Sequence, residues 1–453
     1  MSAGDALRSL EVTLDTVLGA IAGPTEPESV WLFDALGRTL ATDVVSGIDL
    51  PPWDNSAMDG YAIRSIDVGK AAPGEPVSLR VIGDLAAGAA PAIAVARGTA
   101  VRIATGARLP PGADAVVPVE LTVPADDAGH RLGPASRDAT GPTPPVVLVE
   151  VALTPGGSIR RAASDLGRGE RVLEAGTVVR PAAIAIAAGV GIERLDLHRR
   201  PIVGVLATGD EIRAPGQPLG DAGIPDANGP ALMALVAEAG GDPRSLGIAA
   251  DRLEDVRARL CAGLAENPDL IVVSGGVSVG PYDHVRAAFA EIGTVDLWRV
   301  AVQPGKPFAF GTTRSGGPDD RPERKVPVLL FGLPGNPVST FVTFELFVRP
   351  AILALAGRHD LRRPIDRGRL LDEARTSEGR RAFLRVRALR DEVGAVVRDA
   401  EGRAMVHLSG GPAGQGSHVL SGLASADALA VVPEDVTVHR AGDPVDLWWL
   451  DPG

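Results

Sequence analysis

Hydrophobic residues along the chain recur with different periods, and these periods divide it into segments of different structure. Near the N-terminus they follow a helical spacing that stops at Gly23-Pro24, which predicts one amphipathic helix. The residues at this spacing are Leu10, Leu14, Val17, Leu18 and Ile21. A second helix is predicted for residues 29–36, which end before Gly37, and residues 39–45 have the composition of a strand.

Between residues 52 and 124 the pattern changes to short β-branched runs that are interrupted by glycine, proline and aspartate. Runs such as 77–82 and 100–103 predict the strands of a small β-rich module. Residues 125–145 lack apolar periodicity and are predicted to form a surface loop. A strand resumes over residues 146–153.

From Pro201 to about Gly357, apolar strands alternate with helical segments. Asn228 is interpreted as a helix N-cap, and Asp251 with Glu254 resembles a capping box. Continuous apolar strands separated by helices are typical of a parallel sheet that helices cover on both faces. The strands are predicted at 202–207, 269–273, 295–302 and 326–331, and the helices at 228–239, 251–264 and 282–292.

After Arg362 the pattern returns to short β-type runs joined by glycine-rich turns, which predicts a small C-terminal barrel or sandwich. These runs are 382–388, 393–397, 428–432 and 444–450. The predicted fold class is therefore α/β multidomain, with a mostly parallel central sheet and separate β-rich parts.

Charge and composition narrow the possible partners. The formal net charge of −12, from 45 basic and 57 acidic residues, disfavours nucleic acid and acidic membrane surfaces as partners. Cys261 is the only cysteine, which excludes an intrachain disulfide and a zinc site with two cysteines. The seven histidines have no paired spacing typical of a metal site. With neither a signal peptide nor a membrane span predicted, we expect a cytoplasmic protein without a membrane partner.

Three glycine-rich turns directly follow predicted strands of the central block. They are Thr208-Gly209-Asp210-Glu211, Ser274-Gly275-Gly276-Val277-Ser278-Val279-Gly280 and Leu333-Pro334-Gly335-Asn336-Pro337. Turns after parallel strands share the carboxyl edge of the sheet, where their backbone N–H groups favour phosphate or another oxyanion. Neither a G-x-G-x-x-G nor a Walker pattern is present, and each turn taken alone has the simpler interpretation of ending a strand.

Charged residues near these turns suggest how anions would be held. Lys306, in the sequence Gln303-Pro304-Gly305-Lys306-Pro307, offers a positive charge suited to phosphate. Asp210, Glu211 and Asp283 offer oxygen ligands that Mg²⁺ prefers. A solvated surface lysine and ordinary helix capping are the alternatives.

The segment 51–61 is rich in turn residues but also contains Trp53, Met58 and Tyr61. Such side chains predict that the segment packs against a ligand or a second subunit, unless it is an ordinary packed turn. Thr105 lies after a predicted strand in the same module.

Together these motifs resemble the molybdopterin molybdenumtransferase family, known as MoeA in bacteria and as the E domain of gephyrin in animals. The resemblance extends from about Leu10 to Leu450 and includes the segment 414–420 with Ala426-Asp427. Its motifs are LPPWDNSAMDGYA (50–62), RIATGA (102–107), ATGDE (207–211), SGGVSVG (274–280), QPGKPFAFG (303–311) and LPGNPVS (333–339).

The resemblance implies an elongated homodimer in which the β-rich module of one subunit reaches the central domain of the other. It implies four domains in each chain. These are an elongated N-terminal domain (1–50 and 146–180), the inserted module (51–145), a central α/β molybdopterin-binding domain (181–357) and a C-terminal β domain (358–453).

The implied reaction inserts molybdate into adenylylated molybdopterin with Mg²⁺ and releases AMP and the molybdenum cofactor. By motif position the catalytic residues would be Asp59, Thr105, Asp283 and Lys306, and the Mg²⁺ ligands would be Asp210 and Asp283. The residues that bind the cofactor precursor would be Thr208, Gly209, Asp210, Glu211, Ser274, Gly275, Gly276, Ser278, Pro334, Gly335, Asn336 and Pro337.

Some positions depart from the pattern of the family. Ala163-Ser164 stand where the family often has Gly-Glu, Ala183 stands near a common glutamate, and Gln303 replaces a common lysine. Two alternative functions stay open, namely the preceding adenylyl transfer to molybdopterin and a non-catalytic scaffold like that of gephyrin. Enzymes of the same pathway would be further partners.

Overall fold

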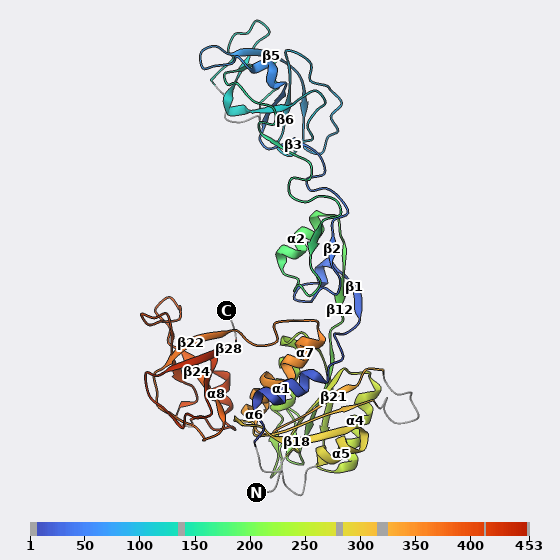
Figure 1. Cartoon of the computed structure of the whole chain (residues 1–453), viewed down its shortest axis with the longest axis vertical. Coiled ribbons are helices and arrows are strands. Elements are labelled where there is room, and N and C mark those ends of the chain that lie inside the picture. Colours follow the sequence, from blue (N-terminus) through green and yellow to red (C-terminus); the bar gives the residue numbers. More distant parts are fainter. Residues whose placement is uncertain (1–6, 135–140, 278–283, 315–324, 412–413, 451–453) are drawn as a thin grey trace.

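A computed structural model describes residues 7–134, 141–277, 284–314, 325–411 and 414–450. The molecule is elongated, with a β-rich module at one end, a small domain in the middle, and the central and C-terminal domains side by side at the other end (Figure 1). The predicted α/β multidomain fold is confirmed.

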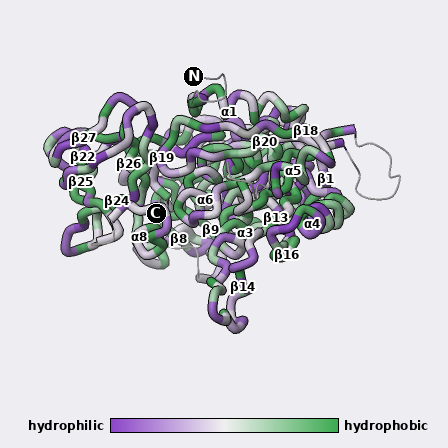
Figure 2. The backbone as a smooth tube through the Cα atoms, turned by 90° about the horizontal axis from the view of Figure 1, so that it is seen from below, coloured by the Kyte–Doolittle hydropathy of each residue, from purple (hydrophilic) through white to green (hydrophobic). Residues whose placement is uncertain are grey.

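The central domain contains a six-stranded mixed sheet with the order β16-β13-β17-β21-β20-β18. The first four of these strands are parallel, and β20 and β18 are antiparallel additions. The strands are β13 (Ile202–Thr208), β16 (Asp242–Ala249), β17 (Leu270–Ser274), β18 (Thr294–Arg299), β20 (Pro307–Thr313) and β21 (Val328–Leu333). A short pair, β14 (Ile212–Arg213) and β15 (Ile224–Pro225), projects from this domain (Figure 2).

Helices cover both faces of the sheet because alternate strand residues face opposite sides. In β17, Leu270 and Val272 belong to the core under one group of helices, whereas Ile271 and Val273 belong to the core under the other. The first group is α1 (Leu10–Gly19), α3 (Asn228–Glu238), α6 (Pro337–Thr343), the π-helix η4 (Phe344–Val348) and α7 (Arg349–Leu355), and the second is α4 (Leu253–Ala265) and α5 (His284–Ile292). Helix α1 confirms the predicted N-terminal helix, but it packs on the central domain.

Helices α6, η4 and α7 form one continuous run, Pro337–Leu355, that is long and apolar enough to cross a membrane. Within the described residues it is the one helix of this kind, and 83% of its hydrophobic window is buried inside the protein. The run therefore has the burial of a core helix.

The N-terminal domain corrects one predicted helix. Residues 29–36 do not form a helix, because β1 (Pro27–Trp31) pairs with β12 (Arg194–His198) and a single 3₁₀ turn, η1 (Leu32–Asp34), follows. Val30 and Leu32 are both buried, a spacing of two that suits a strand. The remaining elements are β2 (Val44–Val45), β11 (Arg171–Leu173) and α2 (Pro181–Gly189).

Two domain boundaries in the structure differ from the predicted ones because of how the elements pack and pair. Helix α2 and strand β12 share a core with residues of the N-terminal domain, such as Leu40 and Val44, so this domain extends to about residue 198 instead of 180. Strand β9 (Val146–Val149) pairs within the inserted module, so residues 146–149 belong to the module. Long-range strand pairing decides both boundaries.

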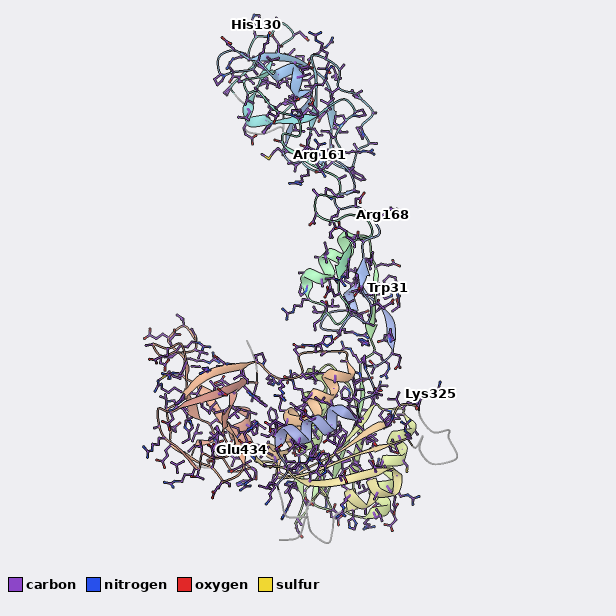
Figure 3. All side chains as sticks on the ribbon, viewed as in Figure 1. Trp31, His130, Arg161, Arg168, Lys325 and Glu434 are labelled. Carbon is purple, nitrogen blue, oxygen red and sulfur yellow. The ribbon has the colours of Figure 1, made fainter. Side chains whose placement is uncertain are left out.

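The inserted module is a six-stranded sheet with the order β7-β4-β6-β5-β9-β8. Its strands are β4 (Gly60–Ile63), β5 (Val77–Leu85), β6 (Thr99–Ile103), β7 (Ala115–Pro118), β8 (Thr122–Ala125) and β9, with the 3₁₀ turns η2 (Ser65–Val68) and η3 (Val119–Leu121). A small pair at its base, β3 (Asn55–Ser56) and β10 (Ile159–Arg160), precedes the connection to the N-terminal domain, where Arg161 and Arg168 lie (Figure 3).

The C-terminal domain is a barrel beside the central domain (Figure 2). Strands β24, β25, β22, β28 and β26 pair in a closed ring, and β19 (Val302–Gln303) of the preceding segment adds to β24. The elements are β22 (Ile365–Leu370), β23 (Ala374–Arg375), β24 (Arg381–Ala388), β25 (Ala404–Leu408), α8 (Leu420–Ala424), β26 (Ala428–Val432), β27 (Val438–His439) and β28 (Pro444–Trp449). The strand predicted for 393–397 is absent, because those residues contribute only an isolated bridge between Val396 and Arg390.

Candidate functional site

The three glycine-rich turns lie together at one edge of the central sheet. Strands β13, β17 and β21 are neighbours and run parallel, so their carboxyl ends share this edge. The turns touch directly: the Gly275 N–H donates to the Leu333 carbonyl over 3.1 Å, and the Thr208 hydroxyl donates to the Ser274 carbonyl over 3.4 Å.

Glycine is required at position 275 by both conformation and space. Its φ angle is +96°, and a Cβ atom there would lie 2.7 Å from the Thr208 carbonyl oxygen. A side chain at this position would force the first two turns apart.

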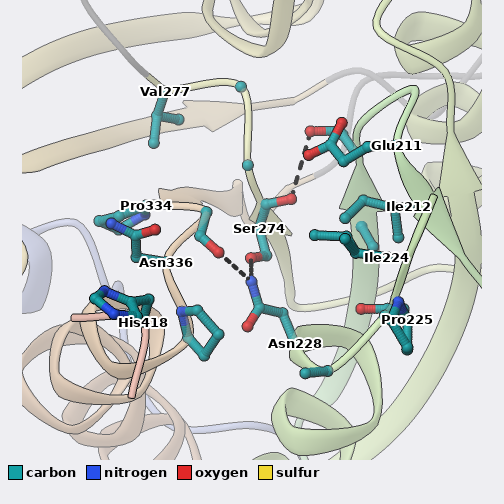
Figure 4. Close-up of a pocket in the computed structure, with 18 of the residues that line it drawn as sticks. Glu211, Ile212, Ile224, Pro225, Asn228, Ser274, Val277, Pro334, Asn336 and His418 are labelled. Carbon is teal, nitrogen blue, oxygen red and sulfur yellow. Dashed lines mark hydrogen bonds between the residues drawn. The ribbon is translucent and has the colours of Figure 1, made fainter. Parts of the chain in front are cut away.

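Asn228 links the second and third turns, which corrects its interpretation as an N-cap. Its amide Nδ2 donates to the Ser274 hydroxyl over 2.8 Å and to the Gly335 carbonyl over 2.7 Å (Figure 4). The N-cap position of α3 is Ala227, which has no capping side chain. The pattern Asn-x-Pro looked like a helix start, and only the tertiary structure shows that the amide reaches across the sheet edge.

A pocket of about 570 Å³ opens over these turns, and we call it the turn pocket. Among the predicted residues, Thr208, Glu211, Ser274, Gly275, Gly276, Pro334, Gly335, Asn336 and Pro337 line it, whereas Gly209 and Asp210 do not, and Ser278 lies outside the described residues. The pocket is also lined by residues that no sequence motif assigned to it, namely Ile212, Ile224, Asp226, Asn228, Asp251, Pro307, His418 and Leu420. His418 and Leu420 belong to the C-terminal domain, so two domains build this pocket.

Carboxylates gather at the mouth of the turn pocket. The Asp251 N–H donates to Asp210 over 3.1 Å, and Glu211 and Asp251 both line the pocket. Burial raises the pKa of Asp251, and the negative charges of Glu211 and Asp210 raise this pKa further. Asp251 is not a capping residue, because α4 begins at Leu253 after Arg252 and has no side-chain cap.

These oxygen donors suit a hard cation such as Mg²⁺. Within the described ranges, however, no three side chains of His, Cys, Asp or Glu are placed to hold one ion. Asp283, the second predicted ligand, lies outside the described residues. Among the described residues, the protein oxygens therefore do not form a complete ligand set for Mg²⁺.

Lys306 lies in a neighbouring pocket of about 390 Å³ and not in the turn pocket. We call this second cavity the anion pocket, because it also contains Arg375 and Arg380. Arg375 is paired with Glu373 over 3.1 Å, whereas the described residues provide no side-chain partner for Lys306 or Arg380. Pro307 lines both pockets, so the two cavities adjoin.

Asp59 and Thr105 of the inserted module contact each other. The Asp59 carboxylate accepts hydrogen bonds from the Thr105 N–H over 2.6 Å and from the Thr105 hydroxyl over 2.9 Å. The backbone N–H and then the hydroxyl lower the pKa of Asp59, so the group is ionised at neutral pH. Within one chain this pair lies in the module at the far end of the molecule from the turn pocket (Figure 1).

The lowered pKa of Asp59 predicts a pH-dependent contribution to stability. A carboxylate whose folded pKa lies below its unfolded value stabilises the fold above the unfolded pKa, about 3.9, and loses this effect as pH falls through the folded pKa. We expect Asp59→Asn to lower the thermal midpoint by about 1–2 °C at pH 7, a small shift because the group is exposed. Thermal denaturation from pH 7 to pH 3 measures this, and a difference that did not shrink toward pH 3 would contradict the assignment to the ionised form.

Three known protein-family regions together match nearly the whole chain. The description "MoeA N-terminal region (domain I and II)" fits residues 2–191, "Probable molybdopterin binding domain" fits 204–354, and "MoeA C-terminal region (domain IV)" fits 367–450. Both pockets lie in the second and third of these regions.

Curated relatives and solved structures agree with these matches. The chain is 37% identical to molybdopterin molybdenumtransferase 2 of Mycobacterium tuberculosis over 94% of its length and 95% of that protein. It is 35% identical to the molybdopterin molybdenumtransferase of a Nostoc species, over 93% and 88% of the two chains. A crystal structure of a molybdopterin biosynthesis MoeA protein from Pyrococcus horikoshii superposes with a TM-score of 0.77 at 29% identity, covering 99% of this chain and all of the other.

Proposed function

Because this chain belongs to the MoeA family of molybdopterin molybdenumtransferases, enzymes of molybdenum cofactor biosynthesis, we propose that it inserts molybdate into adenylylated molybdopterin. The reaction would take place in the cytoplasm and would release AMP and the molybdenum cofactor. The observation that carries this proposal is the pair of adjoining pockets, because both substrates are anions and each pocket suits one of them.

The turn pocket would hold adenylylated molybdopterin. The N–H groups of Gly209 and Gly275 already donate to carbonyls of the protein, so the other backbone N–H groups of the three turns would bind the phosphate. Asn228 ties the second turn to the third. Such pre-organised donors hold phosphate without rearrangement during the reaction. At about 570 Å³ the pocket has the size of a small-molecule site.

The anion pocket would hold molybdate. Lys306 and Arg380 bring positive charge to it, and its wall at Pro307 is shared with the turn pocket. Adjoining pockets orient the two substrates for reaction, which replaces a chance encounter by a fixed geometry. Since Cys261 is the only cysteine, the sulfur ligands of molybdenum would come from the pterin substrate.

Asp210, Asp283 and the substrate phosphate would hold Mg²⁺. The ion would offset negative charge that develops on the phosphoryl oxygens. Asp210 accepts the Asp251 N–H at the pocket mouth, which fixes the direction of its carboxylate. Asp251 keeps a raised pKa beside it, and a bound cation would relieve the repulsion among these carboxylates.

The complete site would form in a homodimer, with Asp59 and Thr105 supplied by the second subunit. The far position of the module within one chain supports this arrangement (Figure 1). A group of exposed apolar side chains on the N-terminal domain offers a face for the second copy: Phe33 is 93% exposed, Leu36 56% and Trp31 48%. Trp31 lies on the narrow middle part of the molecule (Figure 3).

A turnover assay tests the proposed function. Purified protein is given adenylylated molybdopterin, Mg²⁺ and molybdate, and AMP release is measured with and without molybdate. We expect release that depends on molybdate. Activity that required ATP and unmodified molybdopterin would favour the adenylyltransferase alternative, and binding without turnover would favour a scaffold.

Replacement of Lys306 tests the assignment of the anion pocket. We expect Lys306→Met to lower kcat/KM for molybdate about a hundredfold. The reason is that molybdate is a dianion and would lose the positive charge of Lys306, which has no side-chain partner among the described residues of the pocket. Steady-state kinetics with varied molybdate measures this. The matched control is Lys325→Met, which replaces a lysine that lines neither pocket and should behave like the wild type. An unchanged value in Lys306→Met would remove this lysine from the site.

A further inference from the structure

One loop of the C-terminal domain separates the two pockets. We call residues 414–420 the wall loop. Its residues Gln415, Gly416 and Ser417 line the anion pocket, and His418 and Leu420 line the turn pocket. A displacement of this loop would change the shape of both cavities.

The central domain holds the wall loop on one side. The Asn336 amide donates to the Ser417 hydroxyl over 3.0 Å, and the Val338 N–H donates to the Ser417 carbonyl over 3.0 Å. Both donors belong to the third glycine-rich turn and the helix that follows it. The loop is therefore attached directly to the turn that lines the turn pocket.

A buried arginine holds the other side of the loop. Arg385 of β24 is 1% exposed, and its guanidinium donates from Nη1 to the Val419 carbonyl over 2.7 Å and from Nη2 to the Gly414 carbonyl over 3.2 Å. Gln415 accepts from the Arg385 N–H over 2.8 Å, and its own amide donates to the Ser409 carbonyl over 2.6 Å. The Arg385 side chain thus reaches Gly414 and Val419, near the two ends of the wall loop, and the Arg385 backbone holds Gln415 between them.

The charge of Arg385 has no carboxylate partner within the described residues, where its acceptors are carbonyl and amide oxygens. Burial lowers its pKa, as expected for a cation removed from water. A buried cation without a counter-ion is costly, and a neutral side chain would fill the same space at lower cost. The loop carbonyls accept hydrogen bonds from the planar guanidinium, whose fixed donor geometry a lysine does not reproduce.

We infer that Arg385 is a positioning residue, which holds the wall loop so that the anion pocket and the turn pocket take their shapes together. This inference rests on the proposed function for the identity of the two ligands. Arg385 does not line either pocket. It acts through Gln415, which lines the anion pocket, and through Val419, which lies next to His418 in the turn pocket.

Binding and hydrogen exchange test the inference on the full-length protein. The variants are Arg385→Met and Arg385→Lys. The control is Arg369→Met, which removes a partly buried arginine of the same barrel that pairs with Asp399 over 2.9 Å. Calorimetry measures the dissociation constants of molybdate, for the anion pocket, and of AMP, for the turn pocket. We expect both constants to rise about tenfold in Arg385→Met, with a smaller rise in Arg385→Lys and no rise in the control.

Amide exchange of residues 416–420, followed by mass spectrometry without ligand, should accelerate in both Arg385 variants and not in Arg369→Met. If Arg385→Met does not fold, Arg385→Lys provides the same two measurements. The inference would be overturned if the wild type bound both probes and the folded Arg385 variants showed unchanged dissociation constants and unchanged amide exchange of the wall loop. A wild type that bound neither probe would contradict the proposed function, whereas faster loop exchange in the variants would still support the positioning of the loop by Arg385.

Discussion

Mixed dimers of two inactive variants are expected to recover activity. Asp59→Ala removes the module carboxylate and Lys306→Met removes the cation of the anion pocket, and each variant alone should lose activity about a hundredfold. If the module of one subunit completes the pockets of the other, a mixed dimer contains one intact site and one doubly altered site. Random assembly after co-expression makes half of the dimers mixed, so activity should return to about a quarter of the wild-type value.

The control is a double variant that carries both substitutions in one chain, mixed with an inactive single variant. Mixing Asp59→Ala with the double variant leaves every site without the module carboxylate, so no recovery is expected. Size-exclusion chromatography with light scattering establishes that the variants form dimers. Failure of the Asp59→Ala and Lys306→Met pair to recover, in proven mixed dimers, would mean that each chain builds its site alone.

The largest expected effect on stability follows from Arg363, which joins the central domain to the barrel. Its guanidinium donates to Glu345 over 2.7 and 3.0 Å and to Glu238 over 2.9 Å. It also donates to the carbonyls of Trp449 and Leu450 at the end of the barrel. Side-chain exposure is 7% for Arg363 and 1% for Glu345, so the pair is buried.

Arg363→Met would leave the Glu345 carboxylate buried, with Arg349 3.9 Å away as its remaining basic neighbour among the described residues. Removal of one partner from such a pair costs about 3–5 kcal/mol, which lowers the thermal midpoint by roughly 10 °C. Differential scanning calorimetry measures this shift. In the double variant Arg363→Met with Glu345→Gln most of the loss should be regained, because no buried charge is left behind.

Arg398→Met is the matched control for this prediction. Arg398 pairs with Asp366 over 2.8 Å in the same barrel, but its side chain is 43% exposed. Exposed pairs contribute less than about 1 kcal/mol, so the midpoint should fall by no more than a few degrees. Equal losses in the Arg363 and Arg398 variants would show that burial of the Arg363 pair contributes no additional stability.

Elements with a strong local pattern were predictable from the sequence. Continuous apolar runs such as 202–207 could only be buried strands between helices, and the helix at Leu10 followed from its period. Residues 29–36 were predicted wrongly because the strand β1 depends on pairing with β12, more than 160 residues later in the chain. Local propensity contains no information about that partner.

The sequence by itself predicted three glycine-rich turns after parallel strands and one cation in a nearby turn. From the family resemblance it predicted a carboxylate and a threonine in a separate module as further parts of the site. These are local features, since a turn needs particular residues at particular positions. Only the tertiary structure decided that Asn228 ties two turns together, that Lys306 faces a second pocket, and that a loop of the barrel forms the wall between the pockets. The physical reason is that these contacts join segments far apart in the chain, and their geometry is set by how the domains pack.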